Sequence, residues 1–448
     1  MTTKPKIIVL DDDPTGSQTV HSCLLLTRWD VETLQLGLSD DSPIFFVLTN
    51  TRALPPEQAA AVTREVCHNL KIALETAGIQ DFLVVSRSDS TLRGHYPIET
   101  DVIAQEVGPF DAHFLVPAFF EGGRVTRDSV HYLMVDGVET PVHETEFARD
   151  SVFAYRHSYL PDYVEEKTKG RIPADAVERF LLDDIRKGSL ERLQNLSGNQ
   201  CGVVDAETQA DLDKFAADVL AVAADGKHFL FRSAASLLTS LASLGPQPVA
   251  AANMAEYVRQ GKPGAVIVGS HVKKTTQQLE PLLQAPGIVG VMVDVVHLLD
   301  ESEAQGAELL ASTLVKVHDI HADGKTPVVY TSREELSFKD VQTRLKFGAA
   351  VSRLLMDVVR GLPSDLGFLI SKGGITSNDV LSTGLALRSA RLLGQILAGC
   401  SMVRTPPDHP QFPDLPVVLF PGNVGDNNAL VTVYQRLSRG GWGDGVMR

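Results

Sequence analysis

The sequence has only four cysteines in 448 residues, and no two of them form a CxxC pair. Disulfide frameworks and zinc knuckles need closely spaced cysteines, so neither is expected, and a reducing cytoplasm fits best. No apolar run approaches the roughly 20 residues that cross a bilayer. The opening MTTKPKIIVLDDD lacks the long apolar core and the cleavage site of a secretory signal. We therefore expect a cytoplasmic protein without a membrane partner.

Basic residues are too few for a nucleic-acid-binding surface. Lys and Arg number 41 against 56 Asp and Glu, which gives a formal charge of −15. Binding a phosphate backbone needs a basic field, so a nucleic-acid partner is excluded. An anionic small molecule is not excluded, because its site needs only a local cluster of Arg or Lys. The hydrophobic content of 44% is that of a globular protein, and the length suggests two or three domains.

Short apolar runs alternate with longer amphipathic segments, which is the pattern of βαβ units in a parallel sheet. We expect strands at 6–10, 44–48, 81–86 and 113–117, and again at 265–269, 290–295, 327–332, 367–371 and 417–421. The strand pattern lapses between about 125 and 245, and GPQP (245–248) is the best linker. The prediction is an α/β protein with domains 1–245 and 246–448. Each has a mainly parallel sheet flanked by helices, with the active site in the cleft between them.

Ligands of open α/β sheets bind beyond the carboxyl ends of the strands, so the residues just after each predicted strand are candidates for a site. The first strand is followed by DDDPTG, with Asp11, Asp12 and Asp13 in a row. Three carboxylates repel one another, and folding alone would not select them. An Asp-rich turn that caps a helix is one interpretation. The other makes Asp12 or Asp13 a catalytic carboxylate that accepts a proton from a substrate hydroxyl.

The next strand ends in the first half carry guanidinium and hydroxyl groups. Arg52 follows the strand at 44–48. The strand at 81–86 is followed by Arg87, Asp89, Ser90, Thr91, Arg93 and Gly94. Such groups suit bidentate capture of a carboxylate or phosphate, although a helix start with surface arginines explains each loop equally well. Together on one sheet, they favour a pocket for a polyhydroxy acid, and Arg124 after a Gly-Gly turn offers another anion contact.

Glycine-rich turns follow three strands of the second half. Ser270 opens the loop after 265–269, KGGIT follows 367–371, and PGNVGD follows 417–421. Turns of this kind present free N–H groups and a helix dipole to phosphate, so they predict a nucleotide site. Walker A, GxGxxG and protein-kinase signatures are missing, which argues against an oxidoreductase and the common nucleotide folds. HETEF lacks the last histidine of HExxH, and no residue is assigned as a metal ligand.

Six motifs in order, DDDPTG, TLRG, PAFxxGGR, VGSH, KGGITSNDV and PGNVGD, resemble the four-carbon acid sugar kinase family over nearly the whole chain. The resemblance implies an N-terminal domain for a sugar acid and a C-terminal domain for ATP, with phosphorylation of tetronates or 3-oxo-tetronates. Carried over by position, the substrate site falls on Asp12 or Asp13, Arg52, Asp89, Ser90, Thr91 and Arg93. The nucleotide site falls on Ser270, Gly373, Gly374, Ile375, Thr376 and Gly422.

The chain departs from the family pattern at two positions near its first motifs. Asp11 stands where the family commonly has Ala, and Arg87 stands where a Lys often precedes the DST motif by two positions. The last motif reads PGNVG in place of SGNFG, and the middle section is typical of a distinct branch.

The hypothesis is an ATP- and Mg²⁺-dependent kinase that phosphorylates a short sugar acid. Arg52 and Arg93 would hold the substrate carboxylate, and Asp12 or Asp13 would deprotonate the attacking hydroxyl. The alternatives are a non-catalytic two-lobed sugar-acid-binding protein and a kinase for a different small hydroxy acid. A homo-oligomer is compatible with the sequence. The sequence leaves open which acid and which hydroxyl are used.

Overall fold

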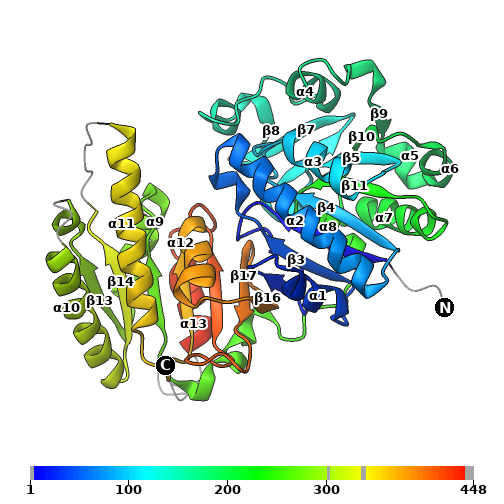
Figure 1. The fold of residues 1–448 in the computed structure, drawn as a ribbon. Coiled ribbons are helices and arrows are strands. Elements are labelled where there is room, and N and C mark those ends of the chain that lie inside the picture. The colour runs from blue at the N-terminus through cyan, green and yellow to red at the C-terminus, as the bar shows by residue number, and fades with distance from the viewer. Residues whose placement is uncertain (1–4, 300–302, 334–339, 439–448) are drawn as a thin grey trace, which may run out of the picture. The chain divides into compact units, whose positions relative to one another are not determined.

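The computed structural model describes residues 5–299, 303–333 and 340–438. The chain forms two compact units, Met1–Pro246 and Gln247–Arg448, called here the N-terminal and C-terminal units. Both contain a mainly parallel sheet with helices, so the predicted α/β class is confirmed (Figure 1). Within the described ranges, no helix is both long and apolar enough to span a membrane.

The N-terminal unit is built on a parallel sheet with the strand order β2–β3–β1–β4–β11–β5–β10–β9. Its strands are β1 (Lys6–Asp11), β2 (Leu24–Leu26), β3 (Ile44–Leu48), β4 (Phe82–Arg87), β5 (Ala112–Val116), β9 (Glu178–Phe180), β10 (Gln200–Val204) and β11 (Phe229–Ser233). The strands predicted from the sequence are confirmed as β1, β3, β4 and β5 within one residue. Their continuous apolar runs are typical of parallel strands buried on both faces, and β3 is buried at all five positions.

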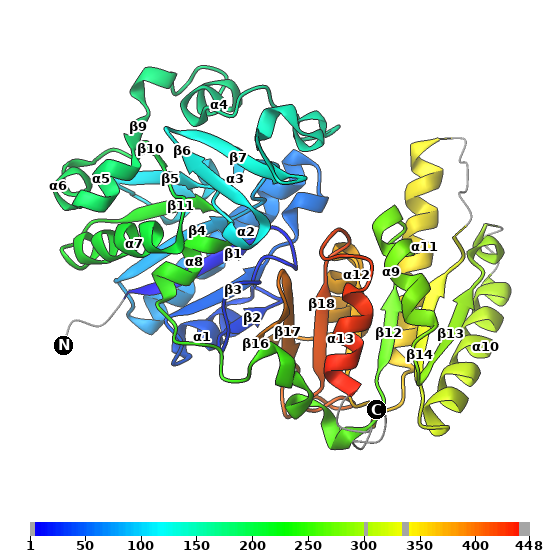
Figure 2. The ribbon, with the colours of Figure 1, turned by 180° about the vertical axis from the view of Figure 1, so that it is seen from behind.

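Helices cover both faces of this sheet. They are α1 (Val31–Ser39), α2 (Pro56–Ala77), α3 (Ile98–Val107), α4 (Leu160–Lys167), α5 (Leu182–Lys187), α6 (Leu190–Asn195), α7 (Gln209–Ala224) and α8 (Ala235–Ala242). Helix α2 begins with a proline, ends at Gly78 with φ +65°, and buries Val66, Leu70 and Leu74 at four-residue spacing. It lies in front of the sheet in Figure 1, whereas α7 and α8 lie in front in Figure 2.

The expectation that strands lapse between about 125 and 245 is wrong. This stretch contains β9, β10 and β11 of the parallel sheet and a separate antiparallel sheet of β6 (Arg124–Arg127), β7 (Val130–Val135) and β8 (Val138–Pro141). The strands have three to six residues each and lie among charged segments, so their apolar runs are too short to stand out. Two-residue turns at 128–129 and 136–137, all with positive φ, join β6 to β7 and β7 to β8.

The C-terminal unit has the strand order β13–β14–β12–β15–β18–β17–β16, parallel as far as β18 and antiparallel beyond it. Its strands are β12 (Ala265–Val268), β13 (Ile288–Val293), β14 (Thr326–Thr331), β15 (Leu369–Lys372), β16 (Ser389–Leu397), β17 (Cys400–Arg404) and β18 (Pro416–Phe420). Its helices are α9 (Lys273–Leu283), α10 (Glu303–Ala322), α11 (Val341–Arg360), α12 (Gly374–Asp379) and α13 (Ala429–Ser438). The five predicted strands are confirmed within two residues, whereas β16 and β17 were not predicted.

Candidate functional site

Three neighbouring strands bring the polar loops of the N-terminal unit to one edge of its sheet. Asp11, the last residue of β1, is in register with Leu48 of β3 and with Arg87 of β4. The segments that follow β1 and β3 also remain hydrogen-bonded to each other, since the Arg52 N–H donates to the Asp12 carbonyl at 3.2 Å. The sheet topology therefore places the DDDPTG, TNTR and RSDSTLRG segments side by side.

Arg52 lies between two carboxylates of the DDDPTG segment. Its Nη2 contacts Asp12 Oδ1, and its Nη1 lies 3.5 Å from Asp13 Oδ2. Burial alone would lower the pKa of Arg52, but the charges of Asp12 and Asp13 raise it well above its usual range. The predicted residues Asp12, Asp13 and Arg52 therefore form one cluster joined by side-chain contacts.

The two aspartates differ in what remains open to a ligand. Asp12 is 1% exposed, and its second oxygen accepts a 2.6 Å hydrogen bond from the Ser88 hydroxyl. Asp13 is 23% exposed, and its Oδ1 accepts from the N–H of Thr15 at 2.8 Å and from the Thr15 hydroxyl. Burial would raise the pKa of Asp13, but Arg52 and Arg87 lower it on balance. Asp13 is therefore the ionised carboxylate of this pair that solvent and a substrate can reach.

A buried chain of polar groups behind Asp12 was missed in the sequence. Arg232, at the end of β11, donates to the hydroxyls of Ser86 and Ser88 at 2.7 Å each and to Glu99 Oε2 at 2.7 Å. The Thr51 hydroxyl donates to the other Glu99 oxygen at 2.6 Å. Because Ser88 accepts from Arg232, its own proton is directed to an acceptor, and the 2.6 Å contact makes Asp12 that acceptor.

The Asp89–Arg93 segment forms a tight loop with its own ion pair. Arg93 Nε donates to Asp89 Oδ2 at 2.7 Å, and the Thr91 hydroxyl donates to the same oxygen. Burial would raise the pKa of Asp89, but Arg52 and Arg93 hold it well below its usual range. Gly94 has φ +114°, and a Cβ there would meet the Ser88 hydroxyl at 2.3 Å, so the turn requires glycine.

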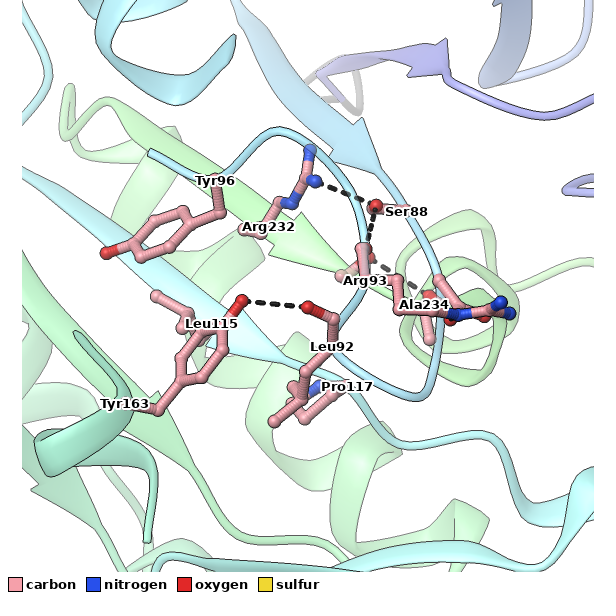
Figure 3. A pocket seen from close by; sticks show the side chains of 11 residues that line it. Ser88, Leu92, Arg93, Tyr96, Leu115, Pro117, Tyr163, Arg232 and Ala234 are labelled. Carbon is pink, nitrogen blue, oxygen red and sulfur yellow. Dashed lines mark hydrogen bonds and ion pairs between the residues drawn. The ribbon is translucent and has the colours of Figure 1, made fainter. Parts of the chain in front are cut away.

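Side chains from other elements hold this loop by its carbonyl groups. Tyr155 and Tyr163 donate to the carbonyls of Thr91 and Leu92 at 2.7 and 2.9 Å, and His131 Nε2 lies 2.8 Å from the Ser90 carbonyl. Burial lowers the pKa of His131 to about 4, which leaves the ring neutral, so it donates to this carbonyl. Ser90 and Thr91, two of the predicted substrate residues, are buried, so their side chains face the interior of the loop more than solvent. Figure 3 shows the small pocket beneath it, with Arg232, Ser88 and Arg93 on one side.

The three glycine-rich turns of the C-terminal unit also meet at one edge, because β12, β15 and β18 are neighbours. A Cβ on Gly373 would lie 2.9 Å from Ser270 Cβ, and one on Gly422 would lie 3.5 Å from the Ser270 hydroxyl. Thr376 is 7% exposed and lies close to Gly373, whereas Ile375 is 68% exposed. Gly374 begins α12. The structure thus brings all the predicted nucleotide residues together.

Lys372 was not singled out in the sequence, although it precedes the GGIT turn. Its side chain is fully buried, and Nζ donates to the carbonyls of Pro421 and Gly422 at 2.6 and 3.1 Å. Nζ also lies 4.2 Å from the Phe420 ring centroid. Burial lowers the pKa of Lys372 to about 7. This lysine therefore ties the PGNVGD turn to β15.

A metal ion held by the protein alone would need several ligands close together. In the parts of the chain that the structure describes, no group of three or more His, Cys, Asp or Glu side chains is arranged to hold a metal ion. A magnesium ion that arrives with a nucleotide needs few protein ligands, because phosphate oxygens and water supply most of its coordination.

Comparison with known proteins gives two matches to domain families. A sugar-binding N-terminal domain matches residues 7–241, and a nucleotide-binding C-terminal domain matches residues 265–430. The chain is 26% identical, over 468 aligned positions, to the D-erythronate kinase of Heliobacterium modesticaldum, covering 96% of this chain and 97% of that protein. It is 28% identical over 214 positions to the D-threonate kinase of Bordetella bronchiseptica, covering 43% and 50%.

Two solved structures share the fold. A protein from Salmonella typhimurium LT2, proposed to be a tRNA synthase, has a TM-score of 0.70 at 18% identity and covers 98% of this chain and 99% of its own. A Haemophilus influenzae protein of the DUF1537 family has a TM-score of 0.63 at 18% identity, with coverage of 96% and 100%. The domain matches span both units and most of the chain. The chain therefore belongs to the four-carbon acid sugar kinase family.

Proposed function

We propose that the protein transfers the γ-phosphoryl group of ATP to a hydroxyl of a short sugar acid, of the tetronate or 3-oxo-tetronate class. The observation that carries this proposal is the partly exposed, ionised Asp13 carboxylate beside Arg52, at the carboxyl ends of β1 and β3. A base and a cation at this edge of an α/β sheet suit a substrate with both hydroxyl and carboxylate groups.

The proposal gives Asp13 and Asp12 different tasks. Asp13 accepts the proton of the attacking hydroxyl, because it is the more exposed of the two carboxylates. Asp12 fixes Arg52 from the buried side, since both of its oxygens are engaged by Arg52 and Ser88. Asp89 and Arg93, the partly exposed ion pair of the neighbouring loop, would contribute polar groups to the sugar hydroxyls.

The reaction forms one bond and breaks one. The substrate hydroxyl oxygen attacks the γ-phosphorus, the bond from that phosphorus to the β,γ-bridging oxygen breaks, and ADP leaves with the electron pair. The hydroxyl proton passes to Asp13. This chemistry requires mainly positioning and neutralisation of charge, so a site of fixed carboxylates and guanidiniums suits it.

The C-terminal unit would bind the nucleotide. Backbone N–H groups of the turns at Ser270, Gly373–Thr376 and Gly422 would hold the phosphates. The exposed Ile375 offers an apolar contact to another part of the nucleotide. Mg²⁺ would accompany ATP and neutralise phosphate oxygens.

The test is an ADP-release assay with ATP and a panel of acids, beginning with D-erythronate and D-threonate, which the relatives' names identify as substrates of those proteins. The panel continues with their 3-oxo forms, pentonates and other small hydroxy acids. We expect ADP release that depends on one or a few tetronates and exceeds the rate without acid. Acid binding without ADP release would instead indicate a binding protein, and turnover of only another hydroxy acid would overturn the substrate class.

A further inference from the structure

The arginines around Asp89 differ in whether the protein itself neutralises them. Arg52 contacts Asp12 and Asp13, and Arg93 contacts Asp89 at 2.7 Å and Asp150 at 3.7 Å. Arg87 and Arg232 likewise have acidic partners, Asp11 at 3.5 Å and Glu99 at 2.7 Å. Each of these four arginines therefore has a carboxyl group of the protein beside it before any substrate binds.

Arg124 has no such partner. Among the residues that the structure describes, no carboxylate lies within ion-pairing distance of its guanidinium, and burial lowers the pKa of Arg124 although the charge of Asp89 opposes this. Its Nη1 donates to the Gly122 carbonyl at 2.5 Å, and the guanidinium carbon lies 5.7 Å from the Phe119 ring centroid. Its Nε is buried and makes no hydrogen bond there. Nε–H is thus a donor without an acceptor among the described residues, and a guanidinium with such a donor suits a carboxylate ligand.

The chain before Arg124 is shaped around this side chain. A Cβ on Gly122 would lie 1.9 Å from Arg124 Nη1, so any larger residue would displace the guanidinium. Gly123 has φ +71°, and its backbone turns the chain into β6. Arg124 is partly buried. Holding a partly buried cation without a carboxylate costs free energy, which indicates a function other than stability.

Arg124 belongs to the same site as the Asp89–Arg93 loop. Its charge interacts with those of Asp89 and Arg93. The strand that pairs with β6 is β7, and His131 of β7 donates to the Ser90 carbonyl, so the hairpin that carries Arg124 is fixed to the loop.

We propose that Arg124 binds the carboxylate of the sugar acid, an inference that rests on the proposed kinase function. A sugar monoacid brings one carboxylate, and Arg124 is the arginine of this group whose guanidinium contacts no carboxylate among the described residues. Arg52 and Arg93, which the sequence led us to expect in this role, then orient Asp13 and the sugar hydroxyls. Arg124 thereby determines the choice of an acid over a neutral polyol of the same length.

The test compares Arg124→Ala and Arg124→Lys with the wild type by steady-state kinetics, using the best acid of the panel and erythritol as the neutral polyol. Loss of a charge-assisted contact should raise the KM for the acid on the order of 100-fold in Arg124→Ala. The KM of Arg124→Ala for erythritol should stay within about threefold of the wild-type KM, so the variant loses the preference for the acid. Arg124→Lys keeps the charge without the planar guanidinium, so its KM for the acid should lie between those of the wild type and Arg124→Ala. Arg127→Ala is the control, because this arginine of the same strand is paired with Glu139 and Glu207.

The outcomes separate this inference from the kinase proposal. If the wild type turns over an acid and Arg124→Ala keeps its KM within threefold, the role of Arg124 is wrong and the kinase proposal stands. If the wild type turns over no acid, the kinase proposal fails. The role of Arg124 is then tested by the rise in melting temperature that the acid causes in the wild type and in Arg124→Ala. Loss of that rise in Arg124→Ala supports the inference, and an equal rise refutes it. If Arg124→Ala does not fold, Arg124→Lys decides in the same way.

Discussion

Asp11 and Arg87 are cross-strand neighbours in β1 and β4, and Arg87 Nη1 lies 3.5 Å from Asp11 Oδ1. They occupy the two positions at which the first motifs depart from the common family pattern, Asp11 in place of Ala and Arg87 in place of Lys. Both side chains are buried, at 0% and 7% exposure. The two departures therefore lie in direct contact, and a buried carboxyl group accompanies a larger buried cation.

This pairing predicts non-additive stability. Asp11→Ala leaves Arg87 without its partner, and Arg87→Lys leaves Asp11 with a shorter cation, so each should lower the melting temperature. The double variant restores the common family pair and should be more stable than the sum of the single effects by about 0.5–3 kcal/mol. Scanning calorimetry of the four proteins measures this coupling. Additive effects would show that the two changes are independent.

Asp11 also predicts a pH dependence of stability. Burial raises the pKa of Asp11 to about 7, with Arg87 opposing the shift, and its Oδ2 makes no hydrogen bond among the described residues. The folded protein therefore holds a proton that the unfolded chain releases near pH 4. Stability from this group is complete below pH 4 and falls as the pH rises to about 7, by up to about 4 kcal/mol. Asp11→Asn should remove this slope in urea unfolding, and an unchanged slope would assign it to other groups.

The strand-end rule applied to the sequence located much of the candidate site and failed where a strand was not recognised. Asp13, Arg52 and Arg93 follow strands with clear apolar runs, so their loops could be placed at one edge. Arg232 also lies at a strand end, in FLFRS, but this strand is short and lies in the stretch where the strand pattern is expected to lapse. Recognising β11 would have placed Arg232 at the same edge.

Other features depend on three-dimensional contacts that a linear pattern does not contain. The burial of Lys372 follows from the pairing of β15 with β18. In the chain, the end of β15 at Lys372 and the start of β18 at Pro416 are 44 residues apart. The hairpin of β7 and β8 had a local signal, since Asp136-Gly137 is a favoured two-residue turn. The hydrogen bond of His131 with the Ser90 carbonyl fixes it to the Asp89–Arg93 loop, and the sequence does not indicate this contact.

The different exposure of Asp12 and Asp13 predicts different kinetic effects. Asp13→Asn removes the proton acceptor and should lower kcat about 10²–10⁴-fold with little change in KM for ATP. Asp12→Asn should lower both kcat and stability, because Arg52 and Ser88 lose a buried charged partner. Asp101→Asn, on the surface and paired with Arg171, is the matched control and should be neutral. Full turnover by Asp13→Asn would remove it from the catalytic role.

The chain from Glu99 through Arg232 and Ser88 predicts an indirect effect on the same reaction. Glu99→Gln keeps the shape of the side chain but removes the charge that fixes Arg232 at 2.7 Å. Ser88 would then hold Asp12 less firmly, and we expect kcat to fall about tenfold while KM for the acid changes less than threefold. The measured pH optimum should shift, since the charge balance around Asp12 and Asp13 changes. A loss of melting temperature with unchanged kcat and pH profile would instead show a purely structural role.

Lys372 gives a prediction confined to the C-terminal unit. Lys372→Met retains the apolar length but removes the two hydrogen bonds that hold the carbonyls of Pro421 and Gly422, so the PGNVGD turn loses its anchor. We expect KM for ATP to rise on the order of tenfold, while KM for the acid stays within about twofold, because the acid is assigned to the N-terminal unit. Lys262→Met is the control, because its ion pair with Asp365 is exposed.

The lowered pKa of Lys372 provides a second measurement on the same variant. Folded Lys372 loses its proton near pH 7, whereas the unfolded lysine keeps it to about pH 10.5, so the unfolded state binds more protons between these values. Wild-type stability should therefore gain a contribution from this lysine as the pH rises from 7 towards 10. Lys372→Met should lack that contribution. An ATP KM equal to that of the wild type, together with an unchanged pH slope of unfolding, would show that Lys372 neither orders the turn nor carries the shifted pKa.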